Sequence, residues 1–209
     1  EADGKGKNVW DVFSEKKGNI KTGENAHMAC DFYHQYPNDV ALAKDLHFDA
    51  FGFSVAWSRV MPDGVGRINQ AGLDYYSRVI DQILEKGMDP WLTLYHWDLP
   101  QALQDKGGWS NRDVVGWFSD YVDIVTRTFG DRVKNYKVLN EPSAFCGFGY
   151  MTGEHAPGVK NIFRFLAATH HANLCQAEGG RIVKANVAQA HVGTSFATFC
   201  VQPKDQSPW

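Results

Sequence analysis

Polar residues with catalytic or sugar-binding potential follow three apolar, strand-like segments. The run "YKVLNEP" ends in Asn140-Glu141-Pro142, "LTLYHWD" ends in His96-Trp97-Asp98, and "FSVAWSR" ends in Trp57-Ser58-Arg59. Strand interiors avoid carboxylates, and proline cannot donate to a sheet ladder. A glutamate at the end of such a run therefore indicates either a functional site or a structural cap.

The residue types around Glu141 predict a carbohydrate site. A carboxyl group among aromatic residues is partly desolvated, which raises its pKa, as a general acid working near neutrality requires. Asn140 offers an amide that can donate to and accept from a hydroxyl, while His96 and Trp97 add an imidazole and a flat apolar face. Sugars present hydroxyl edges and C–H faces, so the four groups suit a sugar. The alternative for Glu141 is a helix cap or a partner of an arginine.

Other candidate groups have structural interpretations that we favour. Asp98 precedes Leu-Pro, where an aspartate commonly turns the backbone, and Glu154 lies among turn-forming residues. The adjacent histidines at 170 and 171 would point in different directions on a helix, which favours packing over metal binding. The cysteines form no CxxC pair and are expected to be buried free thiols; they are Cys30, Cys146, Cys175 and Cys200. Nothing in the sequence calls for a metal or an organic cofactor.

Hydrophobic periodicity predicts a helix, then three strand–helix units, then a fourth strand. The helices are expected over residues 36–46, over 73–84, from a cap at Ser110 or Asn111 to 129, and within 161–185. The strands are expected over 48–57, 91–97 and 133–140, and within 191–201. Pro37 is expected in the first turn of the first helix, and Gly87 is expected to end the second.

The alternation of strands and helices implies a parallel sheet with right-handed crossovers. An open doubly wound sheet and a TIM barrel both satisfy this pattern. No Gly-rich phosphate loop follows a strand, and long segments at 58–70, 98–110 and 142–160 follow the polar strand ends. Both observations favour the barrel, whose site lies at the carboxyl ends of its strands. Because a barrel has eight strands, we predict about half of a (β/α)8 TIM barrel, a partial catalytic domain over residues 1–209.

Charge and hydropathy argue against two classes of partner. The 209 residues carry a formal net charge of −3, which gives no reason to expect a nucleic-acid or anionic-membrane surface. The longest apolar runs are far shorter than the ~20 residues of a membrane span. We expect a soluble chain; its compartment stays open, with the cytoplasm favoured.

Several longer motifs closely resemble those of glycoside hydrolase family 1, the retaining β-glucosidases and their relatives. They are "AWSRVMPDG", "LTLYHWDLPQAL", "GGWSNR", "FGDRVKNYKVLNEP" and "GYMTGEHAPG", which occur in the family's order and spacing. The resemblance covers essentially the whole chain. It implies a TIM barrel that hydrolyses terminal β-linked glucosides, galactosides or related glycosides.

The resemblance also implies roles for four residues. Glu141 looks like the general acid/base, and Asn140 looks like the residue that hydrogen-bonds the sugar 2-hydroxyl. His96 resembles the family's ligand to the 3-hydroxyl, and Trp97 would line the same pocket. The implied substrate is a β-glycoside or an oligosaccharide.

The chain departs from the family in three respects. Retention needs a second carboxylate ~5–5.5 Å from the first, and the family's Thr-Glu-Asn-Gly motif, which carries that nucleophile, does not occur here. The strands correspond to family strands two to five, so the first strand and its sugar-binding glutamine are missing as well. Gly52 stands where members usually place an arginine that would keep the nucleophile ionised.

Two hypotheses for the function follow from these observations. The first is a retaining exo-β-glycosidase whose nucleophile lies in the remaining half of the barrel, in the same or a second polypeptide. The second is a catalytically inactive, glycosidase-like carbohydrate-binding or regulatory fragment. The missing nucleophile and Gly52 favour the second hypothesis, whereas the intact Asn140-Glu141 pair argues against it.

Overall fold

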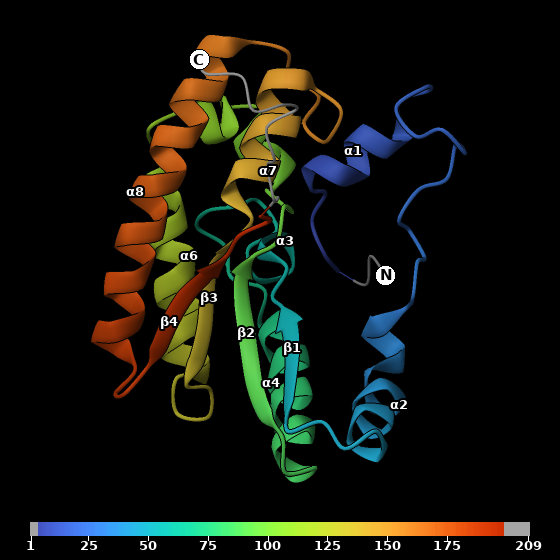
Figure 1. Ribbon diagram of the computed structural model, residues 1–209, viewed down its shortest axis with the longest axis vertical. Coiled ribbons are helices and arrows are strands. Elements are labelled where there is room, and N and C mark those ends of the chain that lie inside the picture. The colour runs from blue at the N-terminus through green and yellow to red at the C-terminus, as the bar shows by residue number, and fades with distance from the viewer. Residues whose placement is uncertain (1–3, 199–209) are drawn as a thin grey trace, which may run out of the picture.

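Four parallel strands form one sheet in the computed structural model, which describes residues 4–198. The strands are β1 (Ala50–Ser54), β2 (Asp89–Tyr95), β3 (Asn135–Asn140) and β4 (His191–Ser195). Their order in the sheet follows their order in the chain, so each neighbouring pair is joined by a crossover. Figure 1 shows α4 and α6 behind the sheet and α8 beside β4, while the face toward the viewer carries no helix.

The longer helices alternate with the strands, and shorter ones occupy the loops. The longer helices are α2 (Phe32–Asp45), α4 (Gln70–Glu85), α6 (Val114–Phe129) and α8 (Ile162–Asn186). The shorter ones are α1 (Val9–Glu15), α3 (Trp57–Val60), α5 (Gln101–Gln104), the 3-10 helix η1 (Gly108–Ser110), α7 (Pro142–Cys146) and the π-helix η2 (Gly147–Thr152). Each long segment after β1, β2 and β3 therefore contains helical turns of its own.

The crossover helices form because their apolar residues recur at helical spacing and face the sheet. In α6 the buried face consists of Val114, Phe118, Tyr121, Val122, Val125 and Phe129. Helix α8 approaches the sheet closely at Gly179, where an added Cβ would lie 2.8 Å from Val138 of β3. Val138 therefore faces the helices, and its strand neighbours Lys137 and Leu139 point to the opposite face of the sheet.

The predicted alternation of elements and the α/β class are confirmed, including the stop at Gly87, which has φ +68°. The predicted position of Pro37 is wrong, because α2 begins at Phe32 and Pro37 lies inside the helix. The predicted cap of α6 is also wrong. Asn111 accepts a hydrogen bond from the Asp113 N–H and Ser110 donates to the Gly107 carbonyl, so both belong to the turn before the helix.

The strand boundaries shift by a few residues from those predicted. Strand β1 is shorter than 48–57, because the chain enters α3 at Trp57. Strand β2 starts at Asp89 and so contains Pro90. The missing N–H of Pro90 costs no ladder bond: the odd-numbered residues of β2 bond β1, and β3 begins only opposite Trp91.

Three further expectations concern cysteines, the last strand and membrane insertion. Cys146 and Cys175 are buried free thiols, but Cys30 is exposed, which contradicts its predicted burial; Cys200 lies outside the described residues. The predicted last strand is observed as β4, although the end of its predicted range also lies outside them. Between residues 4 and 198 no helix is both long and apolar enough to cross a membrane.

Candidate functional site

The carboxyl ends of β2 and β3 bring together the four residues predicted from the sequence to form the site. Asn140 Nδ2 lies 3.1 Å from His96 Nε2, and the Trp97 indole N–H donates to the Asn140 carbonyl at 2.8 Å. Glu141 follows Asn140 directly, and its backbone N–H donates to the carbonyl of Ser195, the last residue of β4. The parallel register explains the convergence, because Tyr95 and Leu139 are paired and the polar residues come next on both strands.

Two residues of this group have a left-handed backbone. Trp97 has φ +74° and Glu141 has φ +47°. Such a conformation costs roughly 1–2 kcal/mol for a residue with a Cβ, so the surroundings must hold it in place. The indole–carbonyl bond and the Glu141–Ser195 bond supply that support. Non-glycine strain at adjacent strand ends is typical of functional sites.

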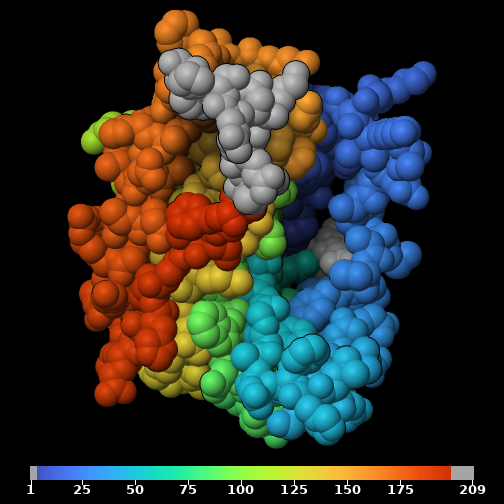
Figure 2. Space-filling view, in the orientation of Figure 1, coloured from blue at the N-terminus to red at the C-terminus, as the bar shows by residue number. Residues whose placement is uncertain are grey.

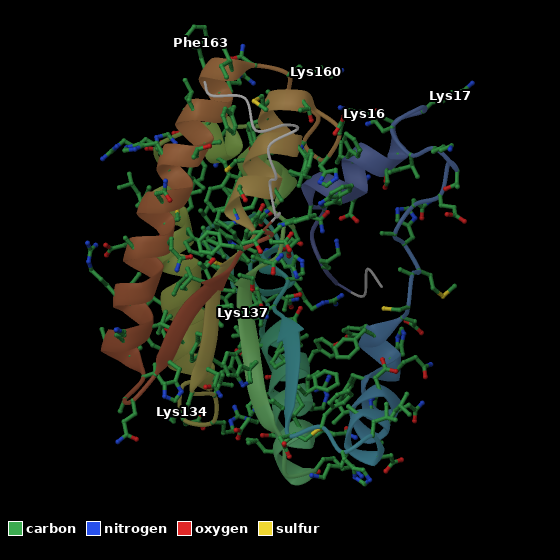
Figure 3. All side chains as sticks on the ribbon, viewed as in Figure 1. Lys16, Lys17, Lys134, Lys137, Lys160 and Phe163 are labelled. Atoms are coloured by element: carbon green, nitrogen blue, oxygen red, sulfur yellow. The ribbon has the colours of Figure 1, made fainter. Side chains whose placement is uncertain are left out.

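His96 is placed to act as a neutral hydrogen-bonding group. Partial burial lowers the pKa of its imidazole, the nearby charge of Glu141 opposes that shift, and the charge of Lys137 adds to it. Lys137 belongs to β3 and lies above Lys134, which precedes that strand, in the view of Figure 3. With its Nε2 accepting from the Asn140 amide, His96 keeps an Nδ1–H free to donate to a ligand, and Asn140 keeps its oxygen free to accept.

Glu141 has neither of the structural roles considered for it. It occupies the position before α7, but its side chain forms no capping hydrogen bond. Within residues 4–198 its carboxylate has no hydrogen bond or ion pair, and the residue is half-buried. A carboxyl group that is held by its backbone and left unpaired is available to a ligand.

Asp98 has a structural contact, although a different one from that predicted. Its Oδ2 accepts from the Trp57 backbone N–H at 3.0 Å, which ties the end of β2 to the start of α3. Its Oδ1 is buried without a hydrogen-bond partner among the described atoms. Burial raises the pKa of this carboxyl from 3.8 to about 6.

An aromatic cluster beside Trp97 was missed by the sequence reasoning. His155 lies 5.5 Å from Trp97, 4.8 Å from Phe148 and 5.4 Å from Trp10, measured between ring centroids. His155 belongs to the "GEHAPG" loop, where Glu154 is exposed, as expected for loop architecture. The spacing of these residues in the sequence gives no sign of their contact, because helix α1, the segment after β2 and the segment after β3 meet here.

A cavity of about 570 Å³ opens beside β1, and Gly52, His96 and Asp98 contribute to its lining. Figure 2 shows the surface hollowed between the N-terminal segment and β1. An added Cβ at Gly52 would meet no atom within 4 Å. Asn140 and Glu141 do not line this cavity, but His96 does, so the cavity adjoins the site at the Asn140–His96 pair.

Known proteins share sequence with this chain over nearly all of its length. The model of the family described as glycosyl hydrolase family 1 matches residues 1–209. β-Glucosidase A of Thermotoga maritima is 41% identical over 205 residues, which cover 98% of this chain and 46% of the relative. β-Glucosidase 6 of Oryza sativa subsp. japonica is 49% identical, with 96% of this chain and 42% of the relative covered.

The solved structures agree with the sequence comparison. The Thermotoga maritima β-glucosidase in complex with glucoimidazole superimposes with a TM-score of 0.97 at 41% identity, covering 99% of this chain and 47% of that one. The chain thus spans about half the length of the relatives that it matches, and its four-stranded sheet is part of a TIM barrel.

Proposed function

Because this chain belongs to glycosyl hydrolase family 1, we propose that it supplies the acid/base half of a retaining exo-β-glycosidase acting on terminal β-linked sugars. The observation that carries the proposal is the Asn140–His96 pair at 3.1 Å beside the unpaired carboxyl of Glu141. Two neutral hydrogen-bonding groups can hold sugar hydroxyls while the acid reaches the glycosidic oxygen.

In the proposed mechanism Glu141 donates its proton to the glycosidic oxygen as the bond from that oxygen to the anomeric carbon breaks. A second carboxylate attacks the anomeric carbon and forms a covalent glycosyl-enzyme. Glu141, now ionised, takes a proton from water, and the resulting hydroxide displaces the second carboxylate. Asn140 hydrogen-bonds the 2-hydroxyl, a contact that strengthens as the transition state develops.

We do not propose that residues 1–209 supply the second carboxylate of this mechanism. The remaining half of the barrel, in the same or a second polypeptide, would provide it and complete the catalytic domain. The sheet supports this view, because β1 and β4 each pair with one neighbour only among the described strands. Large apolar side chains are exposed near the β1 edge, namely Leu42, Leu46 and Phe48.

A chimeric enzyme tests the proposal. Residues 1–209 would replace the matched segment of Thermotoga maritima β-glucosidase A, and hydrolysis of aryl β-glucosides would be measured. Changing Glu141→Ala should lower kcat/KM about 10²–10⁴-fold, most for poor leaving groups, and azide should restore deglycosylation. The matched control Glu154→Ala, on the next loop segment, should change little. Loss of activity without leaving-group dependence or azide rescue would contradict the acid/base role.

The second candidate, an inactive carbohydrate-binding or regulatory fragment, is favoured by glycine at position 52, where family members usually place an arginine. It predicts a chimera that folds and binds sugar but does not turn over. The intact mass of the natural protein distinguishes the two candidates independently. A mass near 23.4 kDa would favour the fragment, and about twice that mass would favour a complete barrel.

A further inference from the structure

Lys137 is the only lysine or arginine in the strands β1 to β4, and it stands in a row of small residues. The register pairs Ser54 with Thr93, Thr93 with Lys137, and Lys137 with Gly193, so the row crosses the whole sheet. None of these three neighbours has a charged side chain, and a Cβ added at Gly193 would meet no atom within 4 Å. Lys137 is therefore the one long side chain of its row.

The side chain of Lys137 lies on the helix-free face of the sheet. Its strand neighbour Val138 faces α8, where a Cβ added at Gly179 would lie 2.8 Å from it. Successive residues of a strand point to opposite faces, so Lys137 points away from the helices. This is the face toward the viewer in Figure 3.

The register also places Asn140 on the face of Lys137. Lys137 pairs with Gly193 and Asn140 with Ser195, so three steps along β3 match two steps along β4. Residues two apart on a regular strand share a face, and paired residues of neighbouring strands share one too. Lys137 therefore stands on the same face as the amide that would hold the sugar, and nearer the amino end of the strand.

The ammonium of Lys137 is partly buried and has no hydrogen bond or ion pair within residues 4–198. Lys134, just before the strand, instead donates to the Gly130 carbonyl at 2.7 Å. Burial lowers the pKa of His96 most, the charge of Glu141 opposes that shift, and the charge of Lys137 adds to it. A cation that is partly removed from water costs free energy unless an anion compensates it. Lys137 therefore calls for an anion near the site.

The two carboxyl groups of a retaining reaction need opposite surroundings. The acid must hold its proton near neutrality, which a nearby cation opposes, whereas the attacking carboxylate must be ionised, which a cation favours. The second carboxylate would lie ~5–5.5 Å from Glu141. It would attack a sugar held by the Asn140–His96 pair, so it would stand over the helix-free face that carries Lys137.

Resting on the retaining mechanism proposed above, we propose that Lys137 is a positioning residue for the second carboxylate. Its ammonium holds that group ionised and supplies part of the positive charge that glycine at position 52 lacks. An ammonium is a point charge on a flexible stem, whereas a guanidinium binds a carboxylate at two points. An arginine at position 52 would therefore still add to the effect of Lys137.

The pH profile of kcat/KM in the chimeric enzyme tests this role. Its acidic limb reports ionisation of the second carboxylate, and its basic limb reports loss of the acid's proton. On a neutral aryl β-glucoside, Lys137→Met should move the acidic limb up by about one pH unit and lower kcat/KM below that limb about tenfold, without moving the basic limb. Lys137→Arg should keep the acidic limb of the parent, and so should the matched control Lys134→Met. An unmoved acidic limb in Lys137→Met, or a loss confined to acidic sugars, would overturn the proposal.

A stability comparison decides without turnover. In the 209-residue chain the ammonium is unpaired, so Lys137→Met should raise the thermal midpoint; in the chimera it would break a pair, so the midpoint should fall, by about 2 °C or more in each case. Changing the glutamate of the chimera's Thr-Glu-Asn-Gly motif to alanine should abolish the fall. The same sign in both proteins would overturn the role of Lys137. An inactive chimera with opposite signs would refute the proposed function alone.

Discussion

Strands β1 and β3 belong to one sheet and rest on the same layer of helices, yet they end very differently. At the end of β3 the chain places Asn140 and a strained Glu141, held by Trp97 and by the Ser195 carbonyl. Along β1 the helix-free face carries Gly52, with no atom within 4 Å of an added Cβ. Side chains that could bind or protonate a substrate therefore gather at the end of β3, whereas β1 carries almost none.

The end of β1 is nevertheless well ordered, by contacts from other elements. The Tyr121 hydroxyl of α6 donates to the carbonyls of Val55 and Leu94, and the Tyr76 hydroxyl of α4 accepts from the Ala56 N–H at 2.7 Å. Asp98 holds the next N–H, that of Trp57. Residues of the helices thus fix the backbone at the ends of β1 and β2. The side chains on the helix-free face determine whether a strand end can bind or protonate a ligand.

The largest effect is expected on β3. In the chimeric enzyme Asn140→Ala removes the partner of His96 and the proposed contact with the sugar 2-hydroxyl, so kcat/KM should fall about 10²–10³-fold. Asn135→Ala is the matched control at the amino end of the same strand, where Asn135 contacts His191 at 3.0 Å. Its rate should stay within about twofold of the parent, as for ordinary surface changes. Equal losses of kcat/KM in both variants would contradict a specific catalytic role for the carboxyl end of β3.

The next effect concerns Asp98, which links the ends of β2 and β1. Burial raises the pKa of its carboxyl from 3.8 to about 6, so the protonated form is favoured in the folded chain. Its contribution to stability is complete below pH 3.8 and is lost as the pH rises through 6. Asp98→Asn cannot ionise, so between pH 4 and pH 7 it should gain about 2–3 kcal/mol in unfolding free energy relative to the parent chain.

Urea unfolding of the 209-residue chain at pH 4, 5, 6 and 7 measures this difference. Asp120→Asn, a change at an exposed position on α6, is the control and should leave the pH dependence as it is in the parent. If Asp98→Asn runs parallel to the parent across this range, the buried-acid interpretation of the β2 end is wrong.

A smaller, opposite effect is expected on β1. Gly52→Arg should raise turnover of the chimeric enzyme about tenfold, because a guanidinium near the second carboxylate would keep it ionised. In this chain a Cβ added at Gly52 would meet no atom within 4 Å. Gly52→Met adds similar bulk without charge and should bring no gain. An unchanged rate in Gly52→Arg would refute the charge-based interpretation of this position.

The sequence predicts the scaffold better than the contacts. Apolar spacing in α6 and the polar ends of β2 and β3 were sufficient to predict the alternation of elements and the convergence of His96 with Asn140. The predicted helix cap at Asn111 was wrong, because its side chain accepts a hydrogen bond within the turn before the helix. The contact between His155 and Trp97 was not predicted, because it joins loops that are far apart in sequence. Periodicity reports which face of an element is buried, whereas such contacts depend on how separate loops meet.

The smallest effect tests how the helices order the bare end of β1. The buried Tyr121 hydroxyl lies 3.0 Å from the Val55 carbonyl and 2.8 Å from the Leu94 carbonyl. Tyr121→Phe keeps the ring but removes this donor from two strand ends, which should lower the free energy of unfolding by about 1–2 kcal/mol. Tyr33→Phe, whose ring stacks on Tyr75, is the control and should change it by less than about 0.5 kcal/mol. If urea unfolding gives both variants the same stability, the hydrogen bonds with β2 alone hold the end of β1 in place. The helices would then not determine the geometry of that strand end.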